Sequence, residues 1–559
     1  MRSQLKTKVY LLFCRVLLAG FGCLASSTCL AASASNSWIK IETDELLVYS
    51  DAPEKEVVEC SLRYVAYRHA FSKLFGVPIS AIPPSTLILF RTTKSFLAKV
   101  QNGESRRSET LNYSAEVDGV PLSAFALSGD VDTALQSAFE FETIWTLPRV
   151  GYSVPIWMAQ GAGEVLSSLS ISKGQCVVGH FVEHTYRDNF EWAYFFGMNT
   201  NSEAYRNPRR LGNYLGQAWG LMHWVLLDGD HAGGNGEHFK GIARRLARSD
   251  GLDAVVAEMN TDPLHLNRAI SQHLSQSPLT PIPFDEKGER ARLVSRMAPE
   301  VEVLIQMANL LNAAEKFSES DAQLDRARAI APDLPLVKEA FARRMERDHR
   351  SENALRLYRE AIAGGSKNAS TYMVSASARL EELRITHRDI VGEGGTEARL
   401  AANELRQAVR LSPARAEAYN LFGRALLLQS EITPEDVSDL TRGIGPDGNN
   451  GSVIYFCALL YSRLGQKAES QANFLKIIQN VQFPEVLRQN ARSHFISDAV
   501  TADAKQIDEF LQQKNYAAAR AIVQSGSTRL DDEELRSTYK RISSLIDERE
   551  SNELSRTAK

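Results

Sequence analysis

The feature that most constrains the fold is a spacing of small and large residues that recurs beyond Pro299, where the sequence carries signals for helices only. Ala354, Tyr358 and Ala361 lie four and then three residues apart, so a helix places all three on one face. The spacing returns, in whole or in part, at Leu324, Ala327 and Pro332, at Ala401, Leu405, Ala408 and Pro413, and at Ala458, Tyr461, Gly465, Ser470, Phe474 and Ile477. A helical hairpin cannot bury its apolar face alone, so repeated hairpins must stack on one another.

This pattern resembles the tetratricopeptide repeat, a hairpin with small residues where its helices cross and bulky residues where neighbouring repeats stack. An unrelated helical bundle is the alternative, because its core also uses Ala and Leu. The recurrence of Ala-x3-aromatic-x2-Ala, with Pro five residues later, favours the repeats. We therefore predict an irregular tetratricopeptide array over residues 299–559, an all-α superhelix with insertions at 387–400 and 433–450.

The inner surface of such an array is formed by the first helix of each hairpin, which here includes Tyr372, Tyr419 and Tyr455. Grooves of this kind bind extended or helical peptide segments, and aromatic rings add contact area at a low cost in side-chain entropy. These residues therefore predict a protein or peptide partner that binds through the helical repeats. The alternative is that the repeats pack back against the N-terminal domain and cover its cleft.

The first part of the chain, residues 35–274, alternates strand and helix signals, which predicts an α+β domain. Short apolar runs within 38–51 and at 85–90 predict strands, and residues 112–130 predict a hairpin that turns near Asp118 and Gly119. A helix is expected to begin at an N-cap, Asp51, and to stop at Gly76. The Ser- and Pro-rich stretch SQSPLTPIPFDE then predicts a linker over 275–298.

Residues 1–34 have the order of a signal peptide. Arg2, Lys6 and Lys8 precede an apolar run, and small residues follow it, with cleavage expected after Ala31 or Ala34. A membrane anchor and a lipoprotein are the alternatives. We expect an exported protein, periplasmic or extracellular, with no membrane span after cleavage. A net charge of −4 over 559 residues gives no electrostatic footprint for a nucleic-acid partner.

One short stretch, VPIWMAQGAGE at 154–164, bears on chemistry. It resembles the phrase P-x-W-[LM]-x-E-G-x-A-E of a large group of zinc peptidases, whose first Glu binds the metal, and Gln160 stands in place of that Glu. Further matching pieces occur in the same order at 44–57, 74–76, 87–96 and 214–226. On these pieces, residues 38–274 resemble the gluzincin-type metallopeptidase domain of bacterial exported proteins that carry C-terminal tetratricopeptide repeats.

The resemblance implies a motif H-E-x-x-H about a dozen residues before the Trp, in which two His bind zinc and the Glu activates water. In this register Glu140 and Ile144 stand where the His ligands are expected, Phe141 stands at the base and Gln160 at the third ligand. A site without its ligands loses its affinity for zinc and its catalysis. The resemblance therefore implies a pseudo-metallopeptidase with neither zinc nor catalytic residues.

The carboxylates near these positions have two interpretations. Glu140, Glu142 and Glu164 could line an acidic cleft. Glu140 and Glu142 are two residues apart on one helix and do not face each other, so an acid–base pair is disfavoured. Charge on a helix surface is the favoured interpretation.

A rival zinc site is the stretch HFVEH at 180–184, which fits the pattern H-x-x-E-H of inverted zinc peptidases. His180 and His184 would then be ligands, Glu183 the base and Glu258 a distant third ligand. Another histidine, His223, lies in an apolar helix and is expected to be a core residue rather than a ligand. Two functions follow: a binding or scaffolding protein with a degenerate peptidase-like domain, or an active zinc peptidase that uses His180 and His184.

Overall fold

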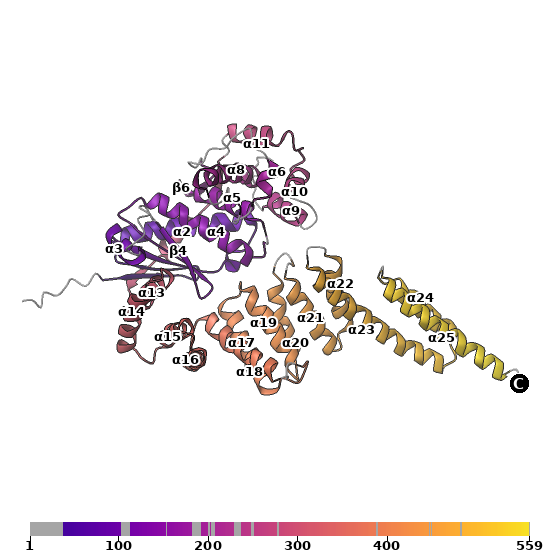
Figure 1. The fold of residues 1–559 in the computed structure, drawn as a ribbon. Helices are drawn as coiled ribbons and strands as arrows, with labels where there is room; N and C mark the ends of the chain where they lie inside the picture. The colour runs from indigo at the N-terminus through magenta and orange to yellow at the C-terminus, as the bar shows by residue number, and fades with distance from the viewer. Residues whose placement is uncertain are drawn as a thin grey trace, which may run out of the picture.

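The computed structural model describes residues 37–557 apart from 102–111, 153, 181–191, 199–201, 203–206, 228–235, 247–250, 277–278, 387–389, 446–447, 449, 481–482 and 531. A mixed sheet with helices forms the N-terminal part, and helices alone follow it (Figure 1). This order confirms the predicted class, α+β and then all-α. The expected signal peptide, residues 1–34, lies outside the described residues. In the described part of the chain, no helix is both long and apolar enough to cross a membrane.

The N-terminal part is built on a six-stranded sheet with the strand order β4-β5-β3-β2-β1-β9. Its strands are β1 (Ile39–Glu42), β2 (Leu46–Ser50), β3 (Ser85–Phe90), β4 (Asn112–Val117), β5 (Val120–Ala126) and β9 (Ser295–Met297). Strands β2, β3 and β5 run parallel, and β4 pairs with β5 as an antiparallel hairpin. The hairpin turns at Asp118 and Gly119 as predicted, and their φ angles of 55° and 74° are those of a tight type I′ turn.

Helices on one face of this sheet form the largest core. They are α2 (Glu54–Phe75), α4 (Val131–Arg149), α5 (Ile156–Ser167) and α8 (Pro208–Leu227). Phe139 of α4 stacks on Tyr67 of α2 with ring centroids 4.6 Å apart, and Trp157 of α5 and Trp219 of α8 belong to the same cluster of buried residues. Shorter helices complete this region: α3 (Thr93–Val100), α6 (Trp192–Phe196), α9 (Glu237–Arg245), α10 (Gly251–Glu258) and α11 (Leu266–Ser275).

The ends of α2 test the expected capping residues. Gly76 ends the helix with a φ of 61°, the left-handed conformation that glycine adopts most easily. The N-cap is Pro53, and the prediction of Asp51 at that position is wrong. Its Oδ1 atom instead accepts a hydrogen bond from the backbone N–H of Arg91 at 2.6 Å. Asp51 therefore fastens the end of β2 to the end of β3.

The segment expected to be a linker, 275–298, is part of the folded N-terminal unit. Apart from 277–278, which lie outside the described residues, it forms β8 (Thr280–Pro283), α12 (Glu286–Arg292) and β9. Strand β9 pairs with β1 at the edge of the main sheet. Strand β8 pairs with β7 (Gln175–Val178), which also pairs with β6 (Ser170–Ser172). Prolines predict a break in this stretch, yet Pro281 and Pro283 lie in the short edge strand β8, where a missing N–H is tolerated.

The first helix of the all-α part completes the other side of the sheet. This helix, α13 (Glu300–Ala313), buries Val303, Met307 and Leu310 against Tyr49 and Phe90 of the sheet. Lys40 of β1 also forms an ion pair with Glu302 at 2.8 Å. The boundary expected at residue 299 therefore separates two kinds of secondary structure, but the hydrophobic core continues across it.

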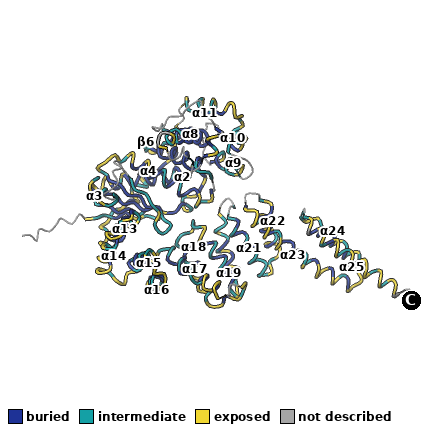
Figure 2. The backbone as a smooth tube through the Cα atoms, in the orientation of Figure 1, coloured by how far each residue is buried: buried dark blue, intermediate teal, exposed yellow. Residues whose placement is uncertain are grey.

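The remaining helices form an elongated array (Figure 1). They are α14 (Phe317–Ile330), α15 (Pro335–Arg347), α16 (Ser351–Ala363), α17 (Ala369–Ile385), α18 (Gly395–Leu411), α19 (Ala416–Leu428), α20 (Pro434–Thr441), α21 (Gly451–Arg463), α22 (Lys467–Gln479), α23 (Glu485–Gln512), α24 (Tyr516–Ser527) and α25 (Glu533–Thr557). Consecutive helices pack on each other, as α15 does on α16, α17 on α18 and α21 on α22. Exposed residues are frequent along α24 and α25, at the end of the array (Figure 2). Ala354, Tyr358 and Ala361 are the buried residues of α16, which confirms the face that their spacing predicted.

Candidate functional site

The positions expected for the lost zinc ligands lie on two neighbouring helices. Glu140 of α4 packs against α5, because a Cβ atom built on Gly163 would lie 3.0 Å from the Cγ atom of Glu140. Gln160 is buried on α5, and Phe141 and Ile144 are half-buried on α4. The order of motifs therefore corresponds to helices that meet in space.

Helix α5 is held between α4 and α8 by glycines on two of its sides. At Gly161 a Cβ atom would lie 2.3 Å from the carbonyl oxygen of Ala218 on α8. At Gly163 it would press on α4, as described above. The glycines of GAG therefore allow close contact between helix backbones, which is a packing role. The conformational entropy that glycine loses in a helix is offset by this contact.

The interpretation of Glu140 and Glu142 as helix-surface charge is wrong for Glu142. Glu142 is fully buried and Glu164 is 6% exposed, whereas Glu140 is half-buried. Apolar residues occur on several sides of α4, so its sequence has only a weak helical periodicity. The spacing of residues along the sequence therefore does not show which carboxylates point inward. Glu142 can be buried because it forms an ion pair with a buried arginine.

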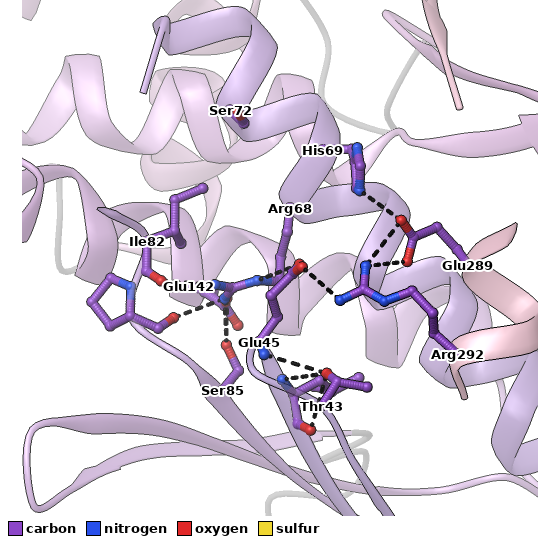
Figure 3. Close-up of polar contacts among 12 residues, drawn as sticks. Thr43, Glu45, Arg68, His69, Ser72, Ile82, Ser85, Glu142, Glu289 and Arg292 are labelled. Atoms are coloured by element: carbon purple, nitrogen blue, oxygen red, sulfur yellow. Dashed lines mark hydrogen bonds and ion pairs between the residues drawn. The ribbon is translucent and has the colours of Figure 1, made fainter. Parts of the chain in front are cut away.

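That arginine is Arg68 of α2, whose side chain is fully buried (Figure 3). Its Nη1 atom lies 3.2 Å from Oε1 of Glu142 and donates a hydrogen bond to the carbonyl oxygen of Pro83 at 2.8 Å. Its Nη2 atom donates to the carbonyl oxygen of Ile82 at 2.9 Å, and Ser85 donates to Oε1 of Glu142 at 2.6 Å. Burial raises the pKa of Glu142, and the Arg68 charge opposes that rise. These five residues, which we call the Arg68 cluster, join α2, α4 and the start of β3.

The ion pairs continue outward from the Arg68 cluster (Figure 3). Glu45, which precedes β2, lies 3.6 Å from Nε of Arg68 and 3.7 Å from Arg292 of α12. Arg292 pairs with Glu289 at 2.9 Å, and Glu289 lies 3.4 Å from His69. Every member has a partner of opposite charge or a hydrogen bond, and the chain of contacts ties α12 to the sheet. This arrangement of ion pairs holds the elements in place.

The rival ligand set is only partly described. His180 lies beside Ser170, with Nε2 and Oγ 3.0 Å apart, and His184 and Glu183 lie outside the described residues. Glu258 pairs with Arg245 at 2.9 Å and with His238 at 3.3 Å. Among the residues that the structure describes, no three His, Cys, Asp or Glu side chains come together as a metal site would require.

His223 is a core residue, as expected. It is 1% exposed, its Nδ1 atom lies 2.9 Å from Nε2 of His273, and its Nε2 atom lies 3.1 Å from the carbonyl oxygen of Gly179. Burial lowers the pKa of both imidazoles to about 4. Both rings are therefore neutral at pH 7 and exchange hydrogen bonds between α8, α11 and the end of β7.

The most concentrated polar contact between the two parts of the chain is at the turn of the β4–β5 hairpin. Arg343 of α15 donates to the carboxylate Oδ2 of Asp118 at 2.6 Å, and the Asn368 amide donates to the same atom at 2.9 Å. Ser370 of α17 donates to the backbone carbonyl oxygen of Asp118 at 2.6 Å, and Arg415 donates to it at 3.1 Å. We call these four donors and their acceptor the Asp118 clamp.

The guanidinium of Arg415 also lies close to the residue after the aspartate, so a side chain there would have to displace it. A Cβ atom built on Gly119 would lie 2.7 Å from the guanidinium carbon of Arg415. The positive φ of Gly119 disfavours any other residue as well. The clamp therefore holds the turn through the carboxylate and the backbone carbonyl oxygen of Asp118, and the turn has glycine in second place.

Beside the clamp lies a cavity of about 720 Å³ between the sheet and the array. The sheet contributes Leu47, Tyr49 and Thr86 to its lining, and the helical part contributes apolar residues such as Leu334 and Leu336. Its charged lining residues are Lys40, Glu42, Asp118, Arg296, Glu302, Glu339, Arg343, Lys367 and Arg415. A cavity of this size with both apolar and charged walls can take a segment of a peptide.

The three tyrosines expected to line the groove differ in exposure. Tyr372 and Tyr419 are 8% and 2% exposed, so their rings belong to the core of the array and offer little surface to a partner. The hydroxyl of Tyr372 donates to the carbonyl oxygen of Ser366 at 3.0 Å. Tyr455 is half-buried against the rings of Phe474 and His494. The predicted contact surface is thereby reduced to Tyr455.

Sequence reasoning placed the hairpin turn but missed its partners. Arg343 is 225 residues from Asp118 in the sequence and Arg415 is 297 residues away, and nothing near either arginine distinguishes it from a surface residue. No family model matches the chain, and no curated protein matches it in sequence.

Proposed function

We propose that this is an exported binding or scaffolding protein, with a zinc-free peptidase-like domain and an array of tetratricopeptide type that binds protein segments. The observation that carries the proposal is the Asp118 clamp. Side chains from α15 and α17, with Asn368 and Arg415 at the starts of α17 and α19, converge on one turn of another part of the chain. A surface that holds one protein turn in this way has the donors needed to hold a partner's.

The resemblance to gluzincin peptidases supports the proposal that the N-terminal domain is peptidase-like and binds no zinc. Gln160 is a neutral amide, and Phe141 and Ile144 offer no ligand atom, so the matching positions supply neither a metal site nor a base. The two described members of the rival set have other partners, since Glu258 pairs with Arg245 and His180 lies beside Ser170. We therefore propose that the peptidase-like domain has a structural or binding role and no catalytic one.

The first test is metal analysis of the purified full-length protein, together with an assay of peptide cleavage. We expect no stoichiometric zinc and no cleavage. One zinc per chain, with cleavage lost in His180→Ala, would establish the alternative function, a zinc peptidase that uses His180 and His184. A zinc that survives this substitution would place the site elsewhere, and it would still contradict the proposal.

The second test concerns binding and uses two exposed lysines as a matched pair. Lys367 lines the cavity beside the clamp, and Lys287 lies on α12, outside the cavity lining. Ligands captured by the full-length protein from cell-envelope extract are compared for Lys367→Glu and Lys287→Glu. We expect Lys367→Glu to lose a ligand that Lys287→Glu keeps. Equal capture by both variants would show that this face of the array is not the binding surface.

A further inference from the structure

The Asp118 clamp has a property that a simple domain contact does not require: its donors all point to the acceptor atoms of a single residue. Arg343 and Asn368 reach the carboxylate, and Ser370 and Arg415 reach the carbonyl. The Asp118 and Arg343 side chains are about one-fifth exposed, at 21% and 20%, so the clamp opens to solvent beside the cavity. The other contacts between the two parts of the chain, such as the packing of α13 on the sheet and the ion pair of Lys40 with Glu302, involve different elements, so the clamp is one concentrated polar site within a wider interface.

We propose that the clamp is a recognition site for acidic turns, and that the Asp118–Gly119 turn occupies it as an internal ligand. The external ligand would be a protein segment with an Asp-Gly turn, which displaces the hairpin. This inference deepens the proposed function, because it names the chemistry of the partner and the segment that competes with it.

The chemistry of the partner follows from the atoms of the clamp. Two arginines and two neutral donors fit an acceptor that carries a negative charge and an adjacent carbonyl. A side chain after the aspartate would displace the guanidinium of Arg415 from the carbonyl oxygen that it binds, and the positive φ of that position disfavours a side chain as well, so glycine is preferred there. A basic side chain in the place of Asp118 is disfavoured because its charge would lie against Arg343.

An external turn must compete with the Asp118–Gly119 turn for the clamp, because that turn belongs to the same chain. A turn tethered to the same chain acts at an effective concentration on the order of millimolar, which a free peptide must overcome. Releasing the internal turn should therefore increase the affinity of an external turn by at least about tenfold.

Two substitutions release the turn by different physical means. Asp118→Lys places a cation against Arg343 and removes the acceptor Oδ2. Gly119→Ala adds a Cβ atom 2.7 Å from the Arg415 guanidinium carbon, at a φ of 74°. The matched control is Gly174→Ala in the β6–β7 turn, where φ is 73° and the nearest atom is 3.9 Å from the new Cβ. The control has the same backbone strain without the contact.

The probe is a labelled cyclic peptide with the sequence of residues 112–126, and fluorescence anisotropy measures its binding to each full-length protein. We expect weak binding to wild type and to Gly174→Ala, and at least tenfold tighter binding to Asp118→Lys and Gly119→Ala. Adding Arg343→Ala to Gly119→Ala should abolish the gain. A peptide with Asn in place of Asp should bind much more weakly.

Hydrogen exchange of the hairpin amides shows whether the turn is released. If the turn is released and the peptide binds no more tightly, the clamp is not a recognition site. If neither substitution releases the turn, the clamp does not hold it, and the inference also fails. If both release variants keep the envelope ligand at wild-type affinity, the inference fails while the proposed function stands.

Discussion

Removing the buried guanidinium of Arg68 tests how the N-terminal part is held together. We choose Arg68→Met, which keeps an unbranched apolar side chain of similar length but removes every donor. Arg68 is fully buried and serves Glu142, Ile82 and Pro83 at once. The substitution therefore leaves a buried carboxylate without its counter-charge and two carbonyl groups without their donors.

The expected loss follows from the penalty for an uncompensated buried charge. Removing one partner of a buried pair destabilises by about 3–5 kcal/mol, because the remaining charge stays desolvated. Glu142 keeps the hydrogen bond from Ser85 at 2.6 Å, which moderates the penalty. Replacing both partners, as in Arg68→Met with Glu142→Leu, removes the stranded charge and should recover at least about 2 kcal/mol.

Tryptophan fluorescence during urea denaturation is a selective assay for this region. All six tryptophans of the chain lie between residues 38 and 224, so their emission reports on the N-terminal part alone. The matched control is Arg63→Met on the same helix, which loses a surface ion pair with the 75%-exposed side chain of Asp132 and should cost less than about 1 kcal/mol. Equal small losses for both arginines, or strictly additive losses in the double variant, would refute the reasoning.

Three further predictions use the same fluorescence signal. Gly161→Ala should destabilise by at least about 2 kcal/mol because its Cβ would meet the backbone of α8, whereas Gly212→Ala, with no neighbouring atom within 4 Å, should stabilise slightly. Imidazoles with a folded pKa of about 4 contribute their full stability above pH 6.5 and lose it as the pH falls toward 4. Wild type should therefore lose about 2 kcal/mol of stability per ring by pH 5, and His273→Gln should lose less. A chain truncated to residues 1–284 keeps β8 but lacks β9 and α13, so it should unfold at lower urea concentration. An unchanged midpoint would show that residues 285–298 do not stabilise the N-terminal part.

Local patterns were sufficient for much of the fold. The buried strand β3, the turn at Asp118 and the end of α2 at Gly76 follow from residues adjacent in sequence, where steric preference decides. The segment 275–298 was misread because composition alone does not distinguish a flexible linker from short strands that pair with distant ones. Strand β9 pairs with β1, and its identity depends on a partner more than 250 residues away, which a local pattern does not contain.

In the candidate site, too, contacts between neighbouring helices could be predicted from the sequence, whereas contacts between distant elements could not. The relation of Glu140 to α5 could be anticipated from motif order, because the two helices are consecutive. The burial of Glu142 could not, because it depends on Arg68 of α2. Long-range ion pairs have no fixed spacing in sequence, so a charged residue in a helix looks the same whether it is solvated or buried with a partner.

The β4–β5 hairpin contacts both α4 and the helical array, so a change at its tip can affect α4. Close to its turn, Glu116 accepts hydrogen bonds from the indole of Trp145 at 2.9 Å and from Arg149 at 2.7 Å, both at the end of α4. Its tip, Asp118, lies in the clamp. A single residue, Val117, therefore separates a contact with α4 from a contact with the array. A partner that displaces the tip would move the acceptor of Trp145, because the strand between them is too short to absorb the shift. Trp145 is thus placed to report on the clamp.

We expect the fluorescence emission of Trp145 to change when a turn peptide binds wild type, and to change less in Glu116→Gln, in which the anionic acceptor is lost. Emission that stays constant while the peptide binds would show that the hairpin tip moves independently of α4.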